Sequence, residues 1–256
     1  MRTRLNAERQ QQIAALIKAQ GRATVEELSE QFGVSEATIR RDLEKLTELG
    51  TVRRARGGAL AIATAEPEPP IIRRAAEYAE AKERIGRAAA ELVRDGETIF
   101  LGSGTTTQAV ARHLGGRRDL KVITNALNVA NVLAAFPEVS TIIVGGLLRN
   151  SELSMIGYLA EQALRDLRAD KVIMGIRALS VEHGLTNELG PETSTDRAIV
   201  RAAPELIVVA DHSKLGRVAT VAVAPLSAVS TLVTSAEAPP EIVEELRRQG
   251  LRVECV

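Results

Sequence analysis

The sequence predicts two domains, a small α+β domain at the N-terminus followed by a larger α/β domain with a mostly parallel sheet. The chain has 256 residues, which is comfortable for two domains and long for one. Three prolines lie between residues 65 and 70, so this stretch is not helical and favours an extended spacer. Helical periodicity dominates before it, whereas apolar strands alternate with helices after it. We predict domains over residues 1–62 and 73–256, with a linker over residues 63–72.

The composition indicates a soluble globular protein of the reducing cytoplasm. Charged residues make up 26% and hydrophobic residues 45%, which argues against disorder. Cys255 is the single cysteine, so an internal disulfide is impossible and a cysteine-based zinc site is not expected. No apolar run approaches the ~18 residues of a membrane span, and the N-terminus turns polar too soon for a signal peptide. The histidines are scattered at no ligand spacing, and we expect neither a metal nor a cofactor.

The formal net charge is zero, but the charges are unevenly spread. Residues 1–62 carry 11 basic and 8 acidic side chains, and residues 63–256 carry the remaining 22 and 25. The chain thus combines a mildly basic head with a mildly acidic body. An asymmetry of this size favours nucleic-acid binding only slightly by itself.

Local signals predict two short helices at the start of the chain. Three apolar residues form one stripe of the first helix: Ile13, Leu16 and Ile17. Gly21 stands where this helix should end. Thr24 and Glu27 have the spacing of a capping box at the start of the second helix. Gly33 can adopt the positive φ that ends the second helix.

A third helix should begin after Ser35, which can cap it, and run to about Glu48. Its buried stripe should consist of Ile39, Leu43 and Leu46. Its opposite face carries Thr38, Arg40, Arg41, Glu44 and Lys45. Two helices joined by a short glycine-containing turn are the helix-turn-helix pattern, whose second helix enters the major groove of DNA.

Two short β-compatible runs, over residues 51–54 and 59–62, flank a Gly-Gly pair and predict a hairpin. This hairpin would be the wing of a winged helix-turn-helix. Arginine contacts phosphate or pairs bidentately with guanine. We therefore expect DNA contacts from Ser35, Thr38, Arg40, Arg41, Lys45, Arg53, Arg54 and Arg56. The alternative is a small helical domain that binds protein, with its arginines as solvated charge.

The body predicts alternating helices and strands. An amphipathic helix should span residues 74–94, and further helices should run through Val110 to Leu114 and over residues 127–135. We expect strands over residues 98–101, 120–123, 140–144, 171–174, 206–210 and 231–234. Uninterrupted apolar strands between helices indicate a parallel sheet covered on both faces. Ligands in such sheets bind outside the carboxyl ends of the strands.

The stretch from Gly102 to Thr107 joins the first of these strands to a helix. Its glycines allow close backbone approach, the helix amides point at an anion, and its hydroxyls add donors. It lacks the Gly-Lys-Ser/Thr of a Walker loop. The stretch also does not match the dinucleotide-binding motif, because the next strand ends in Thr124-Asn125 instead of the acidic residue that binds a ribose. Gly145-Gly146 ends the third strand, and the three loops together favour a small phosphorylated ligand over purely structural turns.

Two further places offer charged groups to such a ligand. Asp211 and Lys214 follow the strand that ends at Ala210, where a carboxylate can bind sugar hydroxyls and an ammonium can bind phosphate. An ordinary loop with a surface ion pair is the alternative. Arg149 follows the Gly145-Gly146 pair and could reach a phosphate, although an exposed arginine is the simpler interpretation of this residue taken alone.

With these motifs the chain resembles the DeoR/GlpR family of bacterial transcriptional regulators over nearly its whole length. In the head the match covers residues 34–43, with the string Thr38-Ile39-Arg40-Arg41-Asp42-Leu43, and residues 54–59. In the body it covers residues 102–107, 124–125, 145–146 with Arg149, 156–157, 169–171, 184–186 and 211–214. The chain departs from the family pattern at Gly102, Asp196 and Ser235, where many members carry Asp, Lys and Asp.

The resemblance implies a winged helix-turn-helix repressor fused to a sugar-phosphate sensor similar in fold to ribose-5-phosphate isomerase and glucosamine-6-phosphate deaminase. Carried over, the phosphate would be held by Ser103, Gly104, Thr105, Thr106 and Thr107. The rest of the effector site would consist of Asn125, Gly146, Arg149, Asp170, Glu192 and Lys214. The implied partners are double-stranded operator DNA, a phosphorylated sugar and further copies of the chain as a homodimer or homotetramer, without a membrane.

Two other functions compete with this hypothesis. The first is a sugar-phosphate isomerase or deaminase that carries a helix-turn-helix head, for which Asp170 or Asp211 could be the general base. No paired acid/base constellation in the sequence demands it, so we expect no enzyme. The second is a protein-binding adaptor, which would show no salt-dependent affinity for DNA.

Overall fold

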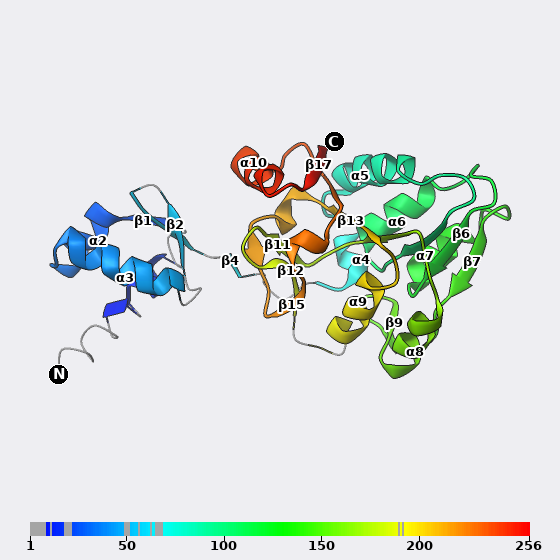
Figure 1. Ribbon diagram of the computed structural model, residues 1–256, viewed down its shortest axis with the longest axis horizontal. Coiled ribbons are helices and arrows are strands. Elements are labelled where there is room, and N and C mark those ends of the chain that lie inside the picture. Colours follow the sequence, from blue (N-terminus) through cyan, green and yellow to red (C-terminus); the bar gives the residue numbers. More distant parts are fainter. Residues whose placement is uncertain are drawn as a thin grey trace. The chain divides into compact units, whose positions relative to one another are not determined.

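The structure is a computed structural model that describes residues 9–10, 12–17, 22–48, 52–55, 57–61, 63–64, 69–188, 190 and 192–256. It divides into two compact units, Met1–Thr64 and Ala65–Val256 (Figure 1). Gly21 and Arg56, to which the sequence assigns a helix end and a DNA contact, lie outside the described residues.

The described part of the head contains helical segments and a small sheet. Residues 9–10 and 12–17 are helical, and α2 (Val25–Phe32) and α3 (Glu36–Glu48) follow. The predicted capping box is confirmed, since the Glu27 backbone N–H donates to Thr24 Oγ1 and the Thr24 N–H donates to Glu27 Oε2. Gly33 ends α2 at φ 61°, a left-handed conformation that costs glycine little. The two helices and the turn between them therefore form as predicted.

The predicted wing is an antiparallel hairpin of β2 (Val52–Ala55) and β3 (Gly58–Ala61). A third strand, β1 (Arg22–Thr24), pairs with the other side of β3 and was not predicted. The head also contains β4 (Ala63–Thr64). Its core consists of the predicted helix stripes together with wing residues, with Ile13, Ile17, Leu28, Ile39 and Leu43 fully buried. Burial of each such side chain contributes about 2 kcal/mol, so the helices and the sheet stabilise one another.

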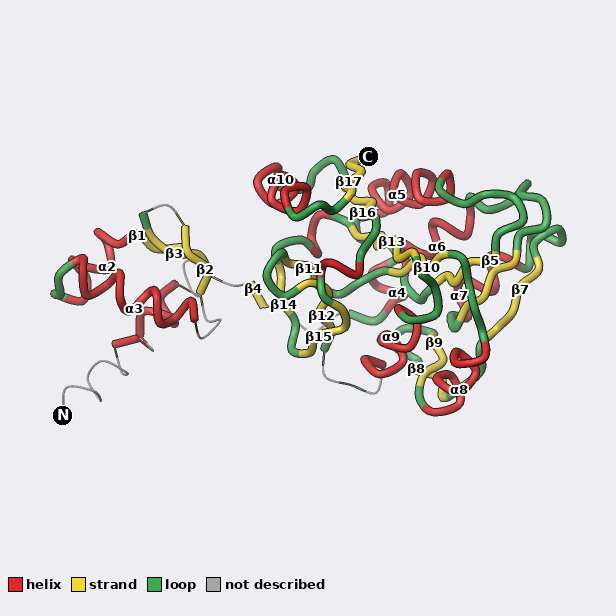
Figure 2. The backbone as a smooth tube through the Cα atoms, viewed as in Figure 1, coloured by secondary structure: helices red, strands yellow, loops and turns green. Residues whose placement is uncertain are grey.

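The body is built on a seven-stranded parallel sheet in the order β17-β16-β13-β10-β5-β6-β7. Its strands, in yellow in Figure 2, are β5 (Thr98–Leu101), β6 (Lys121–Thr124), β7 (Ser140–Ile143), β10 (Lys171–Met174), β13 (Glu205–Ala210), β16 (Thr231–Thr234) and β17 (Arg252–Cys255). Six were predicted within two residues at each end, and β17 was not. The two-domain fold class with a mostly parallel sheet is confirmed.

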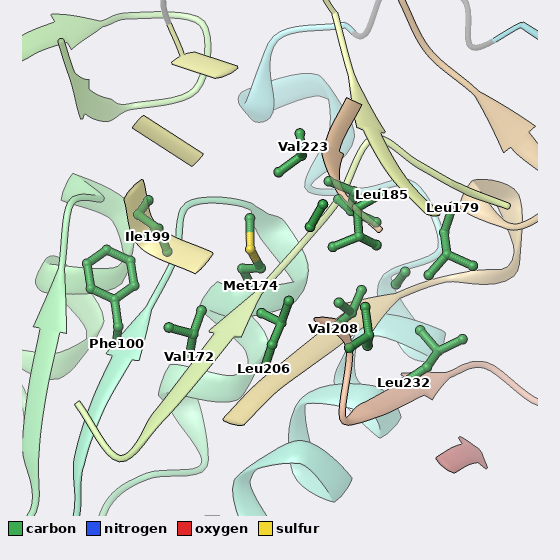
Figure 3. Close-up of a cluster of buried hydrophobic side chains, with 14 of the residues drawn as sticks. Phe100, Val172, Met174, Leu179, Leu185, Ile199, Leu206, Val208, Val223 and Leu232 are labelled. Atoms are coloured by element: carbon green, nitrogen blue, oxygen red, sulfur yellow. The ribbon is translucent and has the colours of Figure 1, made fainter. Parts of the chain in front are cut away.

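Helices cover both faces of this sheet. One face packs against α5 (Ala79–Glu91), α6 (Thr105–Arg112) and α7 (Leu127–Leu133). The other packs against α8 (Tyr158–Asp166), α9 (Glu192–Val200) and α10 (Pro240–Arg248). Figure 3 shows this second core, in which Phe100, Val172, Met174 and Val208 of the strands lie in one cluster with Ile199 and Leu185. Burial on both faces explains why the inner strands β5, β10, β13 and β16 are largely apolar.

Smaller elements surround the sheet. An antiparallel sheet contains β11 (Ala178–Ser180), β12 (Gly184–Asn187) and β15 (Val221–Ala224), and a hairpin contains β8 (Leu147–Arg149) and β9 (Ser154–Ile156). The remaining pieces are η1 (His212–Lys214), β14 (Arg217–Val218) and η2 (Leu226–Ala228). None of them was predicted, because strands of two to four residues give little periodicity.

The helix predicted over residues 74–94 is wrong as one element. It is two helices, α4 (Ile71–Arg74) and α5, separated by a turn. Tyr78 immediately precedes α5 at φ 50°, which a continuous right-handed helix excludes. Arg74 at the end of α4 and Lys82 in α5 both line one cavity.

No described helix is long and apolar enough to cross a membrane. Within the same residues, no group of three or more His, Cys, Asp or Glu side chains could hold a metal ion.

Candidate functional site

The outer face of α3 presents the cations expected of a helix that contacts DNA. Arg40, Arg41 and Lys45 are all exposed. Arg40 pairs with Glu36 one turn earlier at 2.8 Å, and both side chains are more than half exposed. Such a surface pair contributes at most ~1 kcal/mol, so Arg40 can exchange this carboxylate for a phosphate at little cost.

Ser35 and Thr38 shape the start of α3. The Thr38 backbone N–H donates to Ser35 Oγ at 3.4 Å, and the two hydroxyls lie 3.0 Å apart. Ser35 is exposed and Thr38 is half-buried. Both hydroxyls lie at the N-terminus of the helix, where its amides and dipole favour an anion.

The wing contributes Arg54, which is exposed on β2. Arg53 also lies in β2, but its side chain is outside the described part of the chain, as is the whole of Arg56. The structure therefore places five predicted DNA-binding residues at or on α3 and two on the wing strand β2.

The body contains a cavity at the carboxyl edge of the parallel sheet, where the sequence predicts it. Loops after β5, β6, β10 and β13 line it, together with side chains of α4, α5, β8, β9 and α9. The volume of the cavity that the centres of water molecules can reach is about 120 Å³. By the same measure, a cavity that holds one buried water needs ~10–15 Å³. The cavity therefore has room for a small metabolite.

The loop after β5 forms one wall of the cavity. Gly104 precedes α6 at φ 131°, a value open almost only to glycine. No side chain caps the helix, so its first amides are available to an anion. The Gly104 carbonyl accepts hydrogen bonds from Thr107 Oγ1 at 3.1 Å and Asn128 Nδ2 at 3.0 Å. Two side chains thus fix the loop, while Ser103 to Thr106 line the cavity.

Five basic residues line the same cavity, and the charges of two of them, Arg74 and Lys214, act on a third, Lys82. Lys82 is buried, and its Nζ donates to the Arg74 carbonyl at 2.7 Å. Burial lowers the pKa of Lys82, an effect that Asp211 opposes and that the charges of Arg74 and Lys214 reinforce. An anion bound beside these cations would raise the pKa of Lys82 again, because it favours the charged ammonium. The positive cluster and a phosphate would therefore stabilise each other.

Carboxylates and amides dominate another part of the lining. Arg149 pairs with Glu192 at 3.3 Å, and Asn187 Nδ2 donates to Asp196 Oδ2 at 2.7 Å. Burial, aided by the charges of Glu192 and Glu152, raises the pKa of Asp196 to about 6. Such groups bind the hydroxyls of a polyol, since each carboxylate oxygen accepts hydrogen bonds.

Asn125 has an unsatisfied acceptor in this lining. Its side chain is 3% exposed, and its Nδ2 donates to the Met155 carbonyl at 2.9 Å. Its Oδ1 has no hydrogen-bond partner among the described residues. A buried acceptor without a donor costs about 1–3 kcal/mol, which a ligand hydroxyl at this point would recover.

Asp170, predicted on the sugar side, lies at the opposite edge of the sheet. Its Oδ2 accepts from the Thr98 backbone N–H at 2.8 Å. Thr98 begins β5 and Asp170 immediately precedes the parallel strand β10, so both lie at the amino ends of their strands. The prediction for Asp170 is therefore corrected: its carboxylate fixes two strand starts and is remote from the cavity.

Thr107 and Gly146 also do not line the cavity. Thr107 is fully buried, and its hydroxyl donates a hydrogen bond to the Gly104 carbonyl. A Cβ at Gly146 would lie 2.8 Å from the Ile156 carbonyl oxygen, so the glycine permits close packing against β9. The structure thus gives these two residues supporting positions, whereas Asn125, Arg149, Glu192 and Lys214 line the cavity. The ligand contacts of all six stay predictions.

Sequence reasoning missed Lys82, Arg74 and Glu152. Arg74 and Glu152 form a nearly buried ion pair across the cavity wall. Lys82 carries a signal that could have revealed it, since it lies three residues before the buried Ile85 on the inner face of α5. A lysine on an apolar helix face needs a buried partner or a functional reason.

The fold and the cavity together define a class, a winged helix-turn-helix protein whose second domain carries a metabolite-sized cavity. A family model described as the DeoR-like helix-turn-helix domain matches residues 9–65. A second model, the DeoR C terminal sensor domain, matches residues 77–236. The chain therefore belongs to the DeoR family of transcriptional regulators, as its motifs predicted.

Relatives resemble the chain along almost its full length. The glycerol-3-phosphate regulon repressor of Escherichia coli strain K12 is 37% identical over 242 residues, which cover 94% of this chain and 96% of the relative. The HTH-type transcriptional repressor GlcR of Bacillus subtilis strain 168 is 32% identical over 241 residues, covering 94% and 93%. Among solved structures, ribose 5-phosphate isomerase A from Methanocaldococcus jannaschii is 20% identical over 54% of this chain and 55% of that chain, with a TM-score of 0.41.

Proposed function

We propose that this protein is a transcriptional repressor that binds operator DNA through its winged head and is released by a phosphorylated sugar or polyol bound in its body. The relatives that share its whole length are named repressors, one of them of the glycerol-3-phosphate regulon. As a repressor of chromosomal genes it would act in the cytoplasm.

The observation that carries the proposal is the uncapped N-terminus of α6 beside a buried lysine. Helix amides, the hydroxyls of Ser103 to Thr106 and the cations Lys82 and Lys214 line one cavity. This combination matches a phosphate dianion. The carboxylates, Arg149 and Asn125 in the remaining lining match the hydroxyls of a sugar or polyol.

The distribution of carboxylates favours a sensor over an isomerase or deaminase. Asp170 lies at the far edge of the sheet. Asp211 Oδ1 accepts hydrogen bonds from the Ser213 amide and hydroxyl, which fix it as the cap of η1. Of the two candidate general bases, Asp170 is therefore remote from the cavity and Asp211 is held as a helix cap, which supports our proposal of a regulator without catalytic residues.

Release would follow from a population shift. Paired half-sites on DNA require two heads at a set spacing, so we propose a homodimer or homotetramer. A ligand that binds better to one arrangement of the heads than to another weakens operator binding by that difference in affinity. A ligand bound equally well in both arrangements would leave repression unchanged.

Thermal unfolding in the presence of individual sugar and polyol phosphates tests the sensor. A true effector raises the apparent stability of the native protein, by about 2.7 kcal/mol at 100 times its Kd. The unphosphorylated sugars are the matched controls and should give no shift. No stabilisation by any phosphate, or turnover of ribose-5-phosphate or glucosamine-6-phosphate in a coupled assay, would contradict the proposal.

DNA binding is tested separately. Duplexes selected from a random pool should be bound with an affinity that falls steeply as salt rises, because bound cations displace counterions from phosphates. The effector found by thermal unfolding should then lower this affinity. An affinity without salt dependence would instead support a protein-binding adaptor.

A further inference from the structure

Exposed apolar side chains are concentrated at one end of the body. Among the described residues, nine large hydrophobic side chains are exposed, and seven of them lie between residues 127 and 159. We call these seven the β7–α8 surface: Leu127, Ile142, Ile143, Leu147, Leu148, Tyr158 and Leu159. Scattered exposed apolar residues are ordinary, but a concentration of this kind marks an interaction site.

The seven residues belong to elements that contact one another. The Leu127 backbone N–H donates to the Leu153 carbonyl at 2.8 Å, which attaches the start of α7 to the β8–β9 hairpin. A Cβ at Gly146 would lie 3.3 Å from the Ala160 side chain, so the segment after β7 packs on α8. Figure 1 shows β7, β9 and α8 toward the same end of this unit. The residues therefore form one surface.

This surface has no exposed charge. Residues 140–159 contain only two charged side chains, Arg149 and Glu152. Neither is exposed, and both line the cavity. The surrounding chain is 26% charged, so the lack of charge is specific to this segment. Charge is what normally keeps a sheet edge from binding another chain.

The edge strand β7 also lacks the features that normally prevent an edge strand from pairing with another chain. Among the described strands it pairs with β6 on one side only. Ile142 and Ile143 are both exposed, although neighbouring side chains of a strand point to opposite faces. Apolar side chains thus flank an open edge of the sheet, a combination that is a liability in a monomer.

We infer that the β7–α8 surface is the face by which this chain binds a second copy of itself. From their exposed fractions, the seven side chains present on the order of 700 Å², compared with about 800 Å² per partner in a stable interface. A two-fold interface uses the same patch on both copies, so one apolar surface is sufficient. This inference rests on the proposed function in one respect, namely that binding to paired half-sites on DNA requires two copies of the head.

Elements that carry this surface also contribute side chains to the cavity. Arg149 lines the cavity from β8, the strand that carries Leu147 and Leu148 outward. The Gly157 backbone N–H, directly before α8, donates to Thr195 Oγ1 at 3.0 Å, and Thr195 lies in α9 between Glu192 and Asp196. A ligand held by these groups would therefore act on the elements that contact the partner.

Sedimentation velocity of the full chain tests the inference. The wild type should sediment as two or more copies of 27.4 kDa, and the double variant Leu147→Asp/Leu159→Asp as one copy, with self-association at least ten-fold weaker. Ile72→Asp is the matched control, because Ile72 is 77% exposed outside the surface, and should sediment like the wild type. Circular dichroism should show the same fold in all three proteins. A double variant that keeps the wild-type mass, or a monomeric wild type, would overturn the interface.

A chemical readout on the wild type avoids any effect of mutation on folding. The chain has two tyrosines, of which Tyr158 lies in the surface and Tyr78 does not. Tyr158 is more exposed than Tyr78 in a single copy. In the assembled protein, nitration should nevertheless modify Tyr78 at least five-fold faster. Faster nitration of Tyr158 would count against the interface.

The same preparations separate this inference from the proposed function. A monomeric wild type that binds DNA and a sugar phosphate would overturn the interface together with the proposed oligomer, and would leave the proposed DNA and effector binding standing. An oligomer that depends on the surface but binds neither would leave the interface standing and remove the proposed function.

Discussion

Asp42 accepts a hydrogen bond from Arg9 Nε at 2.7 Å on the buried side of α3. Gln10 Nε2 donates to its other carboxylate oxygen, also at 2.7 Å. The neighbouring Arg41 is exposed to solvent on the same helix. Two adjacent charged residues of one motif therefore have different duties: Asp42 attaches the first helix to α3, and Arg41 faces the solvent where DNA would lie.

Asp42→Ala should destabilise the head by about 3 kcal/mol, because it leaves the mostly buried Arg9 without its carboxylate. Hydrogen exchange of the α2 and α3 amides measures this local stability in the full chain. Glu44→Ala, an exposed carboxylate on the same helix, is the control and should leave the exchange unchanged. Equal protection in the Asp42 variant and the control would show that the ion pair contributes nothing to stability.

Arg41→Ala should weaken DNA binding and leave head stability unchanged. If Arg41 pairs with a base, discrimination at that position should fall by about 1–3 kcal/mol, whereas loss of a phosphate contact should lower affinity for all sequences and reduce the salt slope by about one. Anisotropy titrations at several salt concentrations distinguish the two cases. Glu44→Ala should not weaken binding, since it removes a negative charge. Unchanged affinity of Arg41→Ala would remove this residue from the interface.

Thr106→Glu should abolish release by the effector and preserve DNA binding. Thr106 lies in the first turn of α6 and lines the cavity, so a carboxylate there would occupy the space of the phosphate and repel it. Ser227→Glu is the control, because Ser227 is exposed in η2, outside both the cavity and the β7–α8 surface. DNA affinity should be measured with and without effector for both variants. Normal release in the Thr106 variant would exclude this loop from the site.

Much of the fold could be predicted because local signals agreed with the tertiary structure. The capping box at Thr24 and the apolar strands of the sheet are determined by nearby residues and by burial. What could not be predicted depends on distant partners. β1 forms because β3 offers it an edge, and β17 forms because β16 does. The break at Tyr78 places α4 against the cavity, and helical periodicity on either side of it conceals the change.

The candidate site shows the same division. The loop from Ser103 to Thr106 was predictable because strand, glycine and helix start follow one another in the chain. Asp170 and Glu192 were both assigned by resemblance, and only Glu192 lies at the cavity. Asp170 comes before its strand instead of after it, and that order alone places it at the amino edge of the sheet.

Asp196→Asn should change how stability depends on pH. Burial raises the pKa of Asp196 from its ordinary value of 3.8 to about 6 in the folded chain. The folded state therefore binds more protons than the unfolded state between these values, and wild-type stability falls as pH rises through this window. The amide keeps the shape without titrating, so the variant should gain relative stability, up to about 3 kcal/mol by pH 7. Urea unfolding at pH 4 and pH 7 measures the gain, and an equal difference at both values would contradict the raised pKa.

In Gly86→Ala, helix propensity and packing should have opposite effects on the stability of the protein. Gly86 lies inside α5, where alanine would ordinarily stabilise the helix by about 1 kcal/mol. A Cβ at this position would lie 2.6 Å from the Ala109 carbonyl carbon and 2.7 Å from its Cβ. Both contacts are with α6, whose N-terminus is the proposed phosphate site.

Because Ala109 belongs to a helix backbone, it cannot yield as a flexible side chain would. Overpacking of this kind costs about 1–3 kcal/mol, so the clash should outweigh the gain in propensity, and the variant should unfold at lower urea than the wild type. Gly145→Ala, where a Cβ meets nothing within 4 Å, is the control and should be close to neutral. A more stable Gly86→Ala protein would show that α5 and α6 can separate. In that case effector affinity should fall in the same variant, because the start of α6 would move relative to Lys82 on α5.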